Sequence, residues 1–177
     1  MNARLPIPAL LTAAALATGL GAAQAQPPTP APVQTRDFVT AAAQSDQFEL
    51  VEGQVVSAQS RNPRVRAFAQ QMMADHAGTS AALQQAAATS GLPPPPQGLD
   101  GDQQRMLSAL QSLTGPAFDT AYARQQVLAH TKALTLEQRY AAAGPDANIR
   151  RVAQSAVPLI QHHLAMAQQL RGEVGGS

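Results

Sequence analysis

Apolar residues recur at helical spacing in four long segments of the chain, and prolines separate these segments from one another. The four segments are residues 36–60, 63–90, 116–143 and 146–171. They are rich in Ala, Gln, Leu and Arg, and they lack the β-branched alternation that is typical of strands. The boundaries carry the pairs Asn62-Pro63, Gly115-Pro116 and Gly144-Pro145, each typical of a helix end followed by a new first turn. The pattern predicts four long helices and no strand.

The connections between these helices predict how they are arranged. Tight turns join the first helix to the second and the third to the fourth, so each pair forms an antiparallel hairpin. Residues 91–115 separate the two hairpins and contain "GLPPPPQG" and a short predicted helix over residues 102–113. This segment is long enough to run the length of a bundle. We therefore predict an all-α, ferritin-like four-helix bundle with a long crossover. The alternative is an up-down bundle with the short helix folded across one end.

Three stretches of the predicted bundle resemble a known family. They are "RDFVTAAAQSDQFELVEGQVVSAQSRNPRVRAFAQQMMADH" (residues 36–76), "FDTAYARQQVLAH" (residues 118–130) and "VPLIQHHLAMAQQL" (residues 157–170). These runs are similar to a bacterial family of secreted proteins within the ferritin-like group. That family is described only as a domain of unknown function and is often labelled periplasmic or outer-membrane. The resemblance implies the fold and a location outside the cytoplasm, and it implies no activity.

The first 25 residues predict export. Arg4 precedes the apolar stretch "ALLTAAALATGLGAA" (residues 9–23), and Ala23-Gln24-Ala25 matches the small-x-small rule for signal peptidase. The alternative, a membrane anchor, is disfavoured because the stretch is short for a bilayer span and no basic stop-transfer segment follows. We expect a signal peptide cleaved after Ala25, which leaves a periplasmic or secreted protein with no transmembrane span.

The rest of the chain divides into a linker, one domain and a tail. Residues 26–35 ("QPPTPAPVQT") predict a Pro-rich linker, residues 36–171 the helical bundle, and residues 172–177 a flexible tail. The sequence contains no cysteine, which excludes disulfides and a lipid-modified N-terminal cysteine.

Charge excludes two classes of partner. The chain has 12 Lys and Arg against 11 Asp and Glu, and Arg4 is the one charged residue of the expected signal peptide. The mature protein therefore has no formal net charge, and with few aromatic residues it is a poor nucleic-acid binder. It also offers no polybasic surface to a membrane. A protein partner in the cell envelope, bound by an exposed helix face or by the Pro-rich linker, remains open.

Polar residues interrupt the apolar faces of the predicted helices. Glu49, His76 and His163 lie on these faces, and His130 lies at the edge of one. Each falls roughly 15–21 Å along its helix from the same end of the bundle, so the four could meet at mid-bundle. Imidazole and carboxylate groups would suit copper, zinc or iron. Met72, one turn before His76, could add a thioether ligand.

A buried polar network is the competing interpretation of the same residues, and the sequence favours it. A buried Glu49 needs a partner, and a histidine on a facing helix would supply one without any metal. The di-iron pattern Glu-x-x-His is absent, because Met73 stands three residues before His76 and Ile160 three before His163. An iron-oxidising site is therefore not expected.

No sequence motif predicts catalysis. The chain has neither a G-x-S-x-G nucleophile motif nor a Gly-rich phosphate loop, and it carries no established cofactor site. We expect a non-enzymatic binding or structural protein of the cell envelope, with a role in stress suggested by analogy alone. The alternative function is a metal-binding module built on the mid-bundle Glu and His residues.

Overall fold

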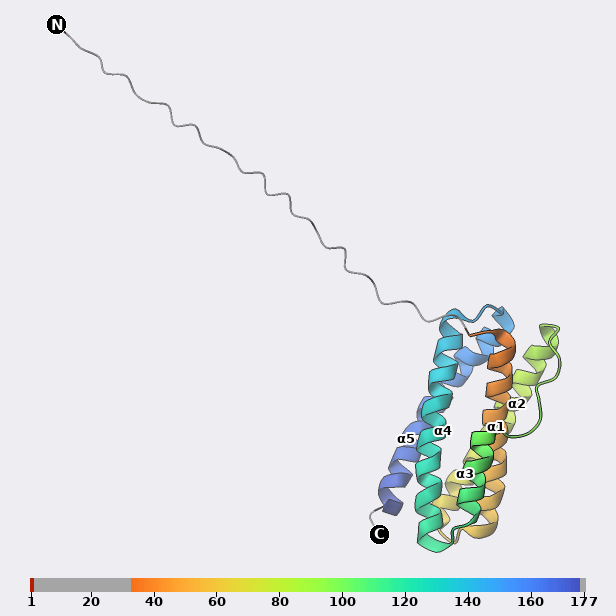
Figure 1. Ribbon diagram of the computed structural model, residues 1–177, viewed down its shortest axis with the longest axis vertical. Coiled ribbons are helices and arrows are strands. Elements are labelled where there is room, and N and C mark those ends of the chain that lie inside the picture. Colours follow the sequence, from red (N-terminus) through yellow and green to blue (C-terminus); the bar gives the residue numbers. More distant parts are fainter. Residues whose placement is uncertain (2–32, 176–177) are drawn as a thin grey trace. The chain divides into compact units, whose positions relative to one another are not determined.

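The computed structural model describes Met1 and residues 33–175, and in this part the chain forms five helices (Figure 1). They are α1 (Thr35–Gln59), α2 (Pro63–Thr89), α3 (Gly101–Gln111), α4 (Gly115–Ala143) and α5 (Ala147–Gly175). The described residues contain no strand, as the sequence predicts. None of these helices is both long and apolar enough to cross a membrane. The expected signal peptide, and the linker up to residue 32, lie outside the described residues.

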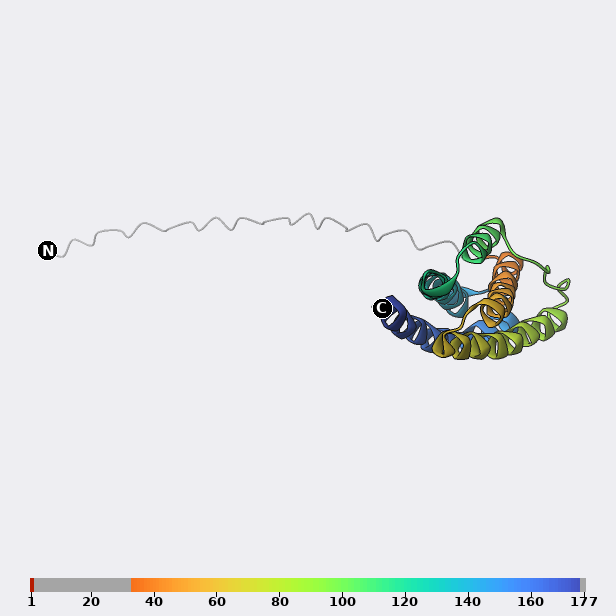
Figure 2. The same cartoon turned by 90° about the horizontal axis from the view of Figure 1, so that it is seen from below.

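The long helices form a four-helix bundle with one crossover, which confirms the predicted architecture. In Figure 1, α1 and α2 form one antiparallel hairpin and α4 and α5 form the other. Helices α2 and α4 run in the same direction, because residues 90–114 return along the bundle before α4 begins. Helix α2 also packs on α5, and α1 packs on α4. Figure 2 shows α3 on the side formed by α1 and α4.

Side-chain caps fix where three of the helices begin. The Asn62 side chain accepts a hydrogen bond from the Arg64 amide at 3.0 Å, with Pro63 in the first turn of α2. Asp100 and Gln103 form a reciprocal capping box at the start of α3. Asp146 accepts backbone hydrogen bonds at the start of α5. These caps place the loops where the prolines and polar residues of the sequence predict them.

A polar layer divides the core of the bundle. The apolar cluster near the α1–α2 turn contains Val56, Val65, Phe68, Met72, Leu110, Phe118, Tyr122, Ala167 and Leu170. The cluster towards the other end contains Phe38, Val39, Leu83, Ala87, Tyr140, Ile149 and Ala153. The rings of Phe38 and Tyr140 stack there with centroids 4.0 Å apart. On each long helix the buried histidine or glutamates fall between these clusters, so apolar packing on both sides holds the polar layer in place.

Helix α5 is longer than predicted, and the described residues 172–175 are helical where a flexible tail was expected. It extends to Gly175, past the expected end of the bundle at residue 171, because Val174 packs on the apolar cluster near the α1–α2 turn. The helix also continues through Pro158, whose side chain is exposed. Proline lacks an N–H group, so the carbonyl of Gln154 loses its helical donor without ending the helix.

Candidate metal centre

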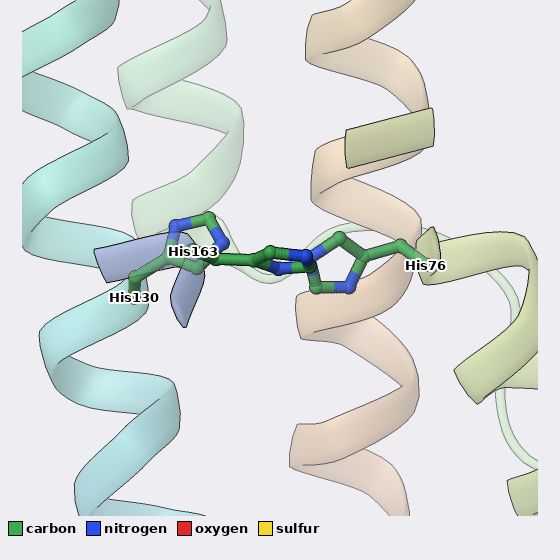
Figure 3. Close-up of side chains that lie close together, drawn as sticks. All are labelled: His76, His130 and His163. Carbon is green, nitrogen blue, oxygen red and sulfur yellow. The ribbon is translucent and has the colours of Figure 1, made fainter. Parts of the chain in front are cut away.

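Three histidine rings meet in the polar layer at mid-bundle. His76 projects from α2, His130 from α4 and His163 from α5, and Figure 3 shows their rings converging. Each residue is only 0–2% exposed. The ring centroids are 5.4–5.6 Å apart, and the ring planes are inclined by 51–78°, so the rings face one another by their edges rather than stacking. The structure thus brings together three of the four residues that the sequence predicts as metal ligands.

One nitrogen of each ring is bound to an oxygen atom on the outer side of this cluster. Nδ1 of His76 lies 2.8 Å from a carboxylate oxygen of Asp46. Nδ1 of His130 lies 2.9 Å from the main-chain carbonyl of Gln126. Nε2 of His163 lies 2.9 Å from a carboxylate oxygen of Asp75. Carbonyl and carboxylate oxygens only accept, so each of these nitrogens donates its proton.

The other nitrogen of each ring has no hydrogen-bond partner among the described residues. These atoms are Nε2 of His76, Nε2 of His130 and Nδ1 of His163. In a neutral ring whose outer nitrogen donates, the remaining nitrogen carries a lone pair. Leaving a buried polar atom without a partner costs about 1–3 kcal/mol, so three such atoms in one layer need an explanation.

A metal ion fits this arrangement of donors. The three rings can each offer one ligand nitrogen with all three atoms within 4.8 Å of one another. The centre of a triangle with edges of 4.8 Å lies about 2.8 Å from each corner, against about 2.0–2.1 Å for a zinc–histidine bond, so sub-ångström side-chain shifts suffice. Metal-bound histidines commonly donate their second nitrogen to a carboxylate or a backbone carbonyl, as all three do here.

Glu49 lies beside the histidines but does not complete the group. Its Oε1 is 4.0 Å from Nδ1 of His130, the nitrogen that already donates to the Gln126 carbonyl. Its Oε2 accepts from the Gln126 amide at 2.7 Å, and the same amide donates to Glu52 at 2.8 Å. Burial and the nearby charge of Glu49 raise the pKa of Glu52 well above its ordinary value. Glu49 and Glu52 thus share the Gln126 amide, and the buried layer disfavours a second negative charge on Glu52.

Met72 and His162 are close to two of the histidines along the chain, and neither belongs to the group of three converging rings. Met72 is fully buried and belongs to the apolar cluster near the α1–α2 turn. His162, next to His163 in the chain, is exposed on α5, and its ring centroid lies 6.4 Å from that of His163. His162 therefore offers a matched control for experiments on His163.

The three imidazoles do not titrate alike. The pKa of His163 is lowered to about 4, mainly by burial. Repulsion from His76 and His130 lowers it further, and the hydrogen bond to Asp75 only partly offsets these effects. Burial also lowers the pKa of His130. Burial opposes a charge on His76 too, but its hydrogen bond to Asp46 and the nearby carboxylates outweigh this and raise its pKa. At neutral pH two of the rings are therefore neutral, and His76 retains a proton in part of the molecules.

Another buried carboxyl group, that of Glu137, lines the same small cavity as Asp46. Glu137 on α4 is buried, and its Oε2 has no hydrogen-bond partner among the described residues. It lines a cavity of about 20 Å³ together with Asp46 and Thr79. This volume suffices for one water molecule. Burial, and secondarily the charge of Asp46, raise the pKa of Glu137 to about 8.

Sequence reasoning missed the oxygen atoms that orient the rings. Asp46 stands one turn before Glu49 and thus on the same side of α1, a spacing that could have identified it. Asp75 immediately precedes His76, which turns it about 100° away from the His76 face of α2, yet it reaches across to α5 and binds His163. That contact depends on α2 and α5 being neighbours, which the sequence does not specify. The Gln126 carbonyl is a backbone atom and leaves no sequence signal.

Comparisons with known proteins identify a family without an assigned activity. A family model described as "Domain of unknown function (DUF4142)" matches residues 20–170. A crystal structure of a DUF305 fragment from Deinococcus radiodurans has a similar fold, with a TM-score of 0.64 and 16% identity, covering 83% of this chain and all of that one. At this identity the likeness concerns the fold alone. No curated protein matches the sequence.

Proposed function

This chain belongs to the DUF4142 family of unknown function, and we propose that it binds one divalent transition-metal ion through His76, His130 and His163. One observation carries the proposal. Three buried ring nitrogens converge without hydrogen-bond partners, while the second nitrogen of every ring is held by an oxygen acceptor. This is the arrangement by which proteins orient imidazoles around a metal ion.

The donor set favours Zn²⁺ or Cu²⁺. Three neutral imidazoles suit both ions, and three histidines leave a fourth position open for water or another ligand. The chain has no thiolate to offer, and Met72 packs in the apolar cluster near the α1–α2 turn, so we propose no sulfur ligand that would favour Cu⁺. The carboxylates Asp46, Asp75 and Glu49 surround the rings and would balance the charge of a divalent cation in this buried layer.

A purely structural hydrogen-bond network explains only one of the two nitrogens of each histidine ring. The bonds to Asp46, Asp75 and the Gln126 carbonyl satisfy the outer nitrogens. The inner nitrogens all present lone pairs in the neutral state, so they cannot satisfy one another. A proton on His76 would supply one donor to this group, which makes proton binding the alternative to metal binding at the same place.

Titration calorimetry of the metal-free protein with Zn²⁺ and with Cu²⁺ tests the proposal. We expect one ion per chain at micromolar concentration, with release of about one proton or less at pH 7. The released proton comes from His76, whose pKa is raised, because His130 and His163 are already neutral. The dependence of the apparent enthalpy on buffer ionisation measures this number, which should fall as the pH rises to 8.5.

Two results of that titration would contradict the proposal. A stoichiometry below about 0.1 ion per chain for both metals would leave the histidine cluster as a structural network. Release of two or three protons per ion would mean that the rings are charged before binding, contrary to the low pKa of His163.

We also propose that the protein meets this metal outside the cytoplasm, since residues 1–25 have the composition of a signal peptide. N-terminal sequencing of protein from the exported fraction should begin at Gln26. Recovery of the protein only in the cytoplasm, with Met1 retained, would overturn this location.

A further inference from the structure

A metal ion needs a path to the three histidines, because each is almost completely buried. The groups behind the rings differ in their access to solvent. The Gln126 carbonyl lies within α4, and the Asp46 side chain is 11% exposed and also accepts from Thr79. The Asp75 side chain is 26% exposed while bound to His163. Asp75 is thus the more solvent-exposed of the two carboxylates that bind a ring of the cluster.

Asp75 stands at one end of a groove between α2 and α5. The groove has a volume of about 620 Å³, and Thr89 and Asn148 line its other end. Small residues on the two helices leave it open, namely Gly78, Ala82, Ala86, Ser155 and Ala156. A side chain added at Gly78 would meet no atom within 4 Å. The groove therefore offers a hydrated ion direct access to the Asp75 carboxylate.

Resting on the metal-binding function proposed above, we infer that divalent cations enter and leave through this groove and that Asp75 passes them to His163. Asp75 accepts hydrogen bonds from Gln71 and His163, and no Lys or Arg in the described part of the chain binds it. Arg151 also lines the groove and donates a hydrogen bond to Asn148 at the other end, so the negative charge of Asp75 faces a cation at its own end of the groove.

The transfer would break one hydrogen bond that the structure contains, between Nε2–H of His163 and the Asp75 carboxylate. A cation held by Asp75 would take the place of this ring as the partner of the carboxylate, and the ring would then be free to turn about its side-chain bonds. Nδ1 of His163 carries a lone pair in the neutral ring, so it binds the cation without losing a proton. When the ring turns back, its Nε2–H returns to Asp75 and the cation lies between the three rings.

Filling the groove tests this path without altering any ligand. The double variant Gly78→Phe/Ala82→Phe should slow both uptake of Cu²⁺ and its removal by a chelator about tenfold or more. Its equilibrium affinity should change by less than about threefold, since an obstructed path lowers both rates alike. The visible absorption of bound Cu²⁺ follows both reactions by stopped flow.

The neighbouring residues Ala77 and Ala81 are exposed and do not line the groove, so Ala77→Phe/Ala81→Phe is the matched control. It should exchange Cu²⁺ at the rate of the parent. If the filled variant exchanges at the parent rate, or the control slows equally, the groove is not the path. If the parent protein binds no Cu²⁺ at all, both the proposed metal-binding function and the entry path are wrong. If it binds Cu²⁺ but the filled variant exchanges it at the parent rate, only the entry path is wrong.

A separate variant tests the role of the Asp75 charge. The uptake rate of the parent should fall as salt concentration rises, because salt screens the attraction of the carboxylate for the cation. In Asp75→Asn uptake should be about tenfold slower and nearly independent of salt. An Asp75→Asn rate that keeps the parent's salt dependence would exclude Asp75 as the residue that attracts the ion.

Discussion

Replacing His163 by alanine should weaken the binding of Zn²⁺ by about 100- to 1,000-fold. Structural zinc sites bind with about 10–16 kcal/mol from four ligands, which is about 2.5–4 kcal/mol for each, and about 1.4 kcal/mol changes an affinity tenfold. His163 is the suitable ligand to remove because its partner Asp75 can be hydrated from the groove. Competition with a chelator of known affinity measures the loss.

The exposed neighbour His162 provides the control for this prediction. His162→Ala removes an exposed imidazole that lies beside the His163 ring but outside the group of three converging histidines, so its affinity should equal that of the parent. Circular dichroism should show that both variants keep their helices. Equal affinity in His163→Ala and the parent would mean that the metal binds elsewhere on the chain.

Glu137 alone should lower the stability of the metal-free protein by about 4 kcal/mol as the pH rises from 5 to 9, and Glu137→Gln should remove this part of the loss. The pKa of Glu137 is about 8 in the folded chain against an ordinary value of 4.5. The folded state therefore keeps a proton that the unfolded state releases, so stability falls as pH rises through this window. Each pKa unit corresponds to about 1.4 kcal/mol. Glutamine stays neutral at every pH.

Urea denaturation at pH 5 and pH 9 measures this effect. Glu137→Gln should match the parent at pH 5 and exceed it by several kcal/mol at pH 9. Glu52, whose pKa is also raised, should leave both proteins with a further dependence of the same sign. Asp37→Asn, which removes an exposed carboxylate from α1, should leave the pH dependence unchanged. Parallel pH profiles for the parent and Glu137→Gln would show that Glu137 does not hold its proton in the folded protein.

The sequence predicts the helices and their connections well because both depend on local signals. Asn62 and Pro63 begin α2 as the pattern indicates, and α3 begins at Gly101, after its cap Asp100 and one residue before the predicted short helix. The crossover is predictable from the length of the connection between the two hairpins. Residues 91–115 are enough to run the length of the bundle, whereas the short turns within each hairpin are not. The end of α5 is less predictable, because Val174 is held by a contact with a distant part of the chain.

The candidate site is predictable only in its histidines. Their helical positions and heights indicate that His76, His130 and His163 can meet, and the structure brings them together. The roles of their neighbours depend on the helix pairing. Asp75 reaches His163 because α2 packs on α5, and Glu49 faces the protonated nitrogen of His130 because of the way α1 packs on α4. Spacing along one helix carries no information on such pairings.

Anomalous diffraction from crystals grown with Zn²⁺ tests the central claim most directly. Data collected on either side of the zinc absorption edge should give one strong peak between the rings of His76, His130 and His163. The peak should lie about 2.0–2.1 Å from one nitrogen of each ring. A zinc peak at His162 or at surface carboxylates, with none between the three rings, would contradict a metal centre at this place.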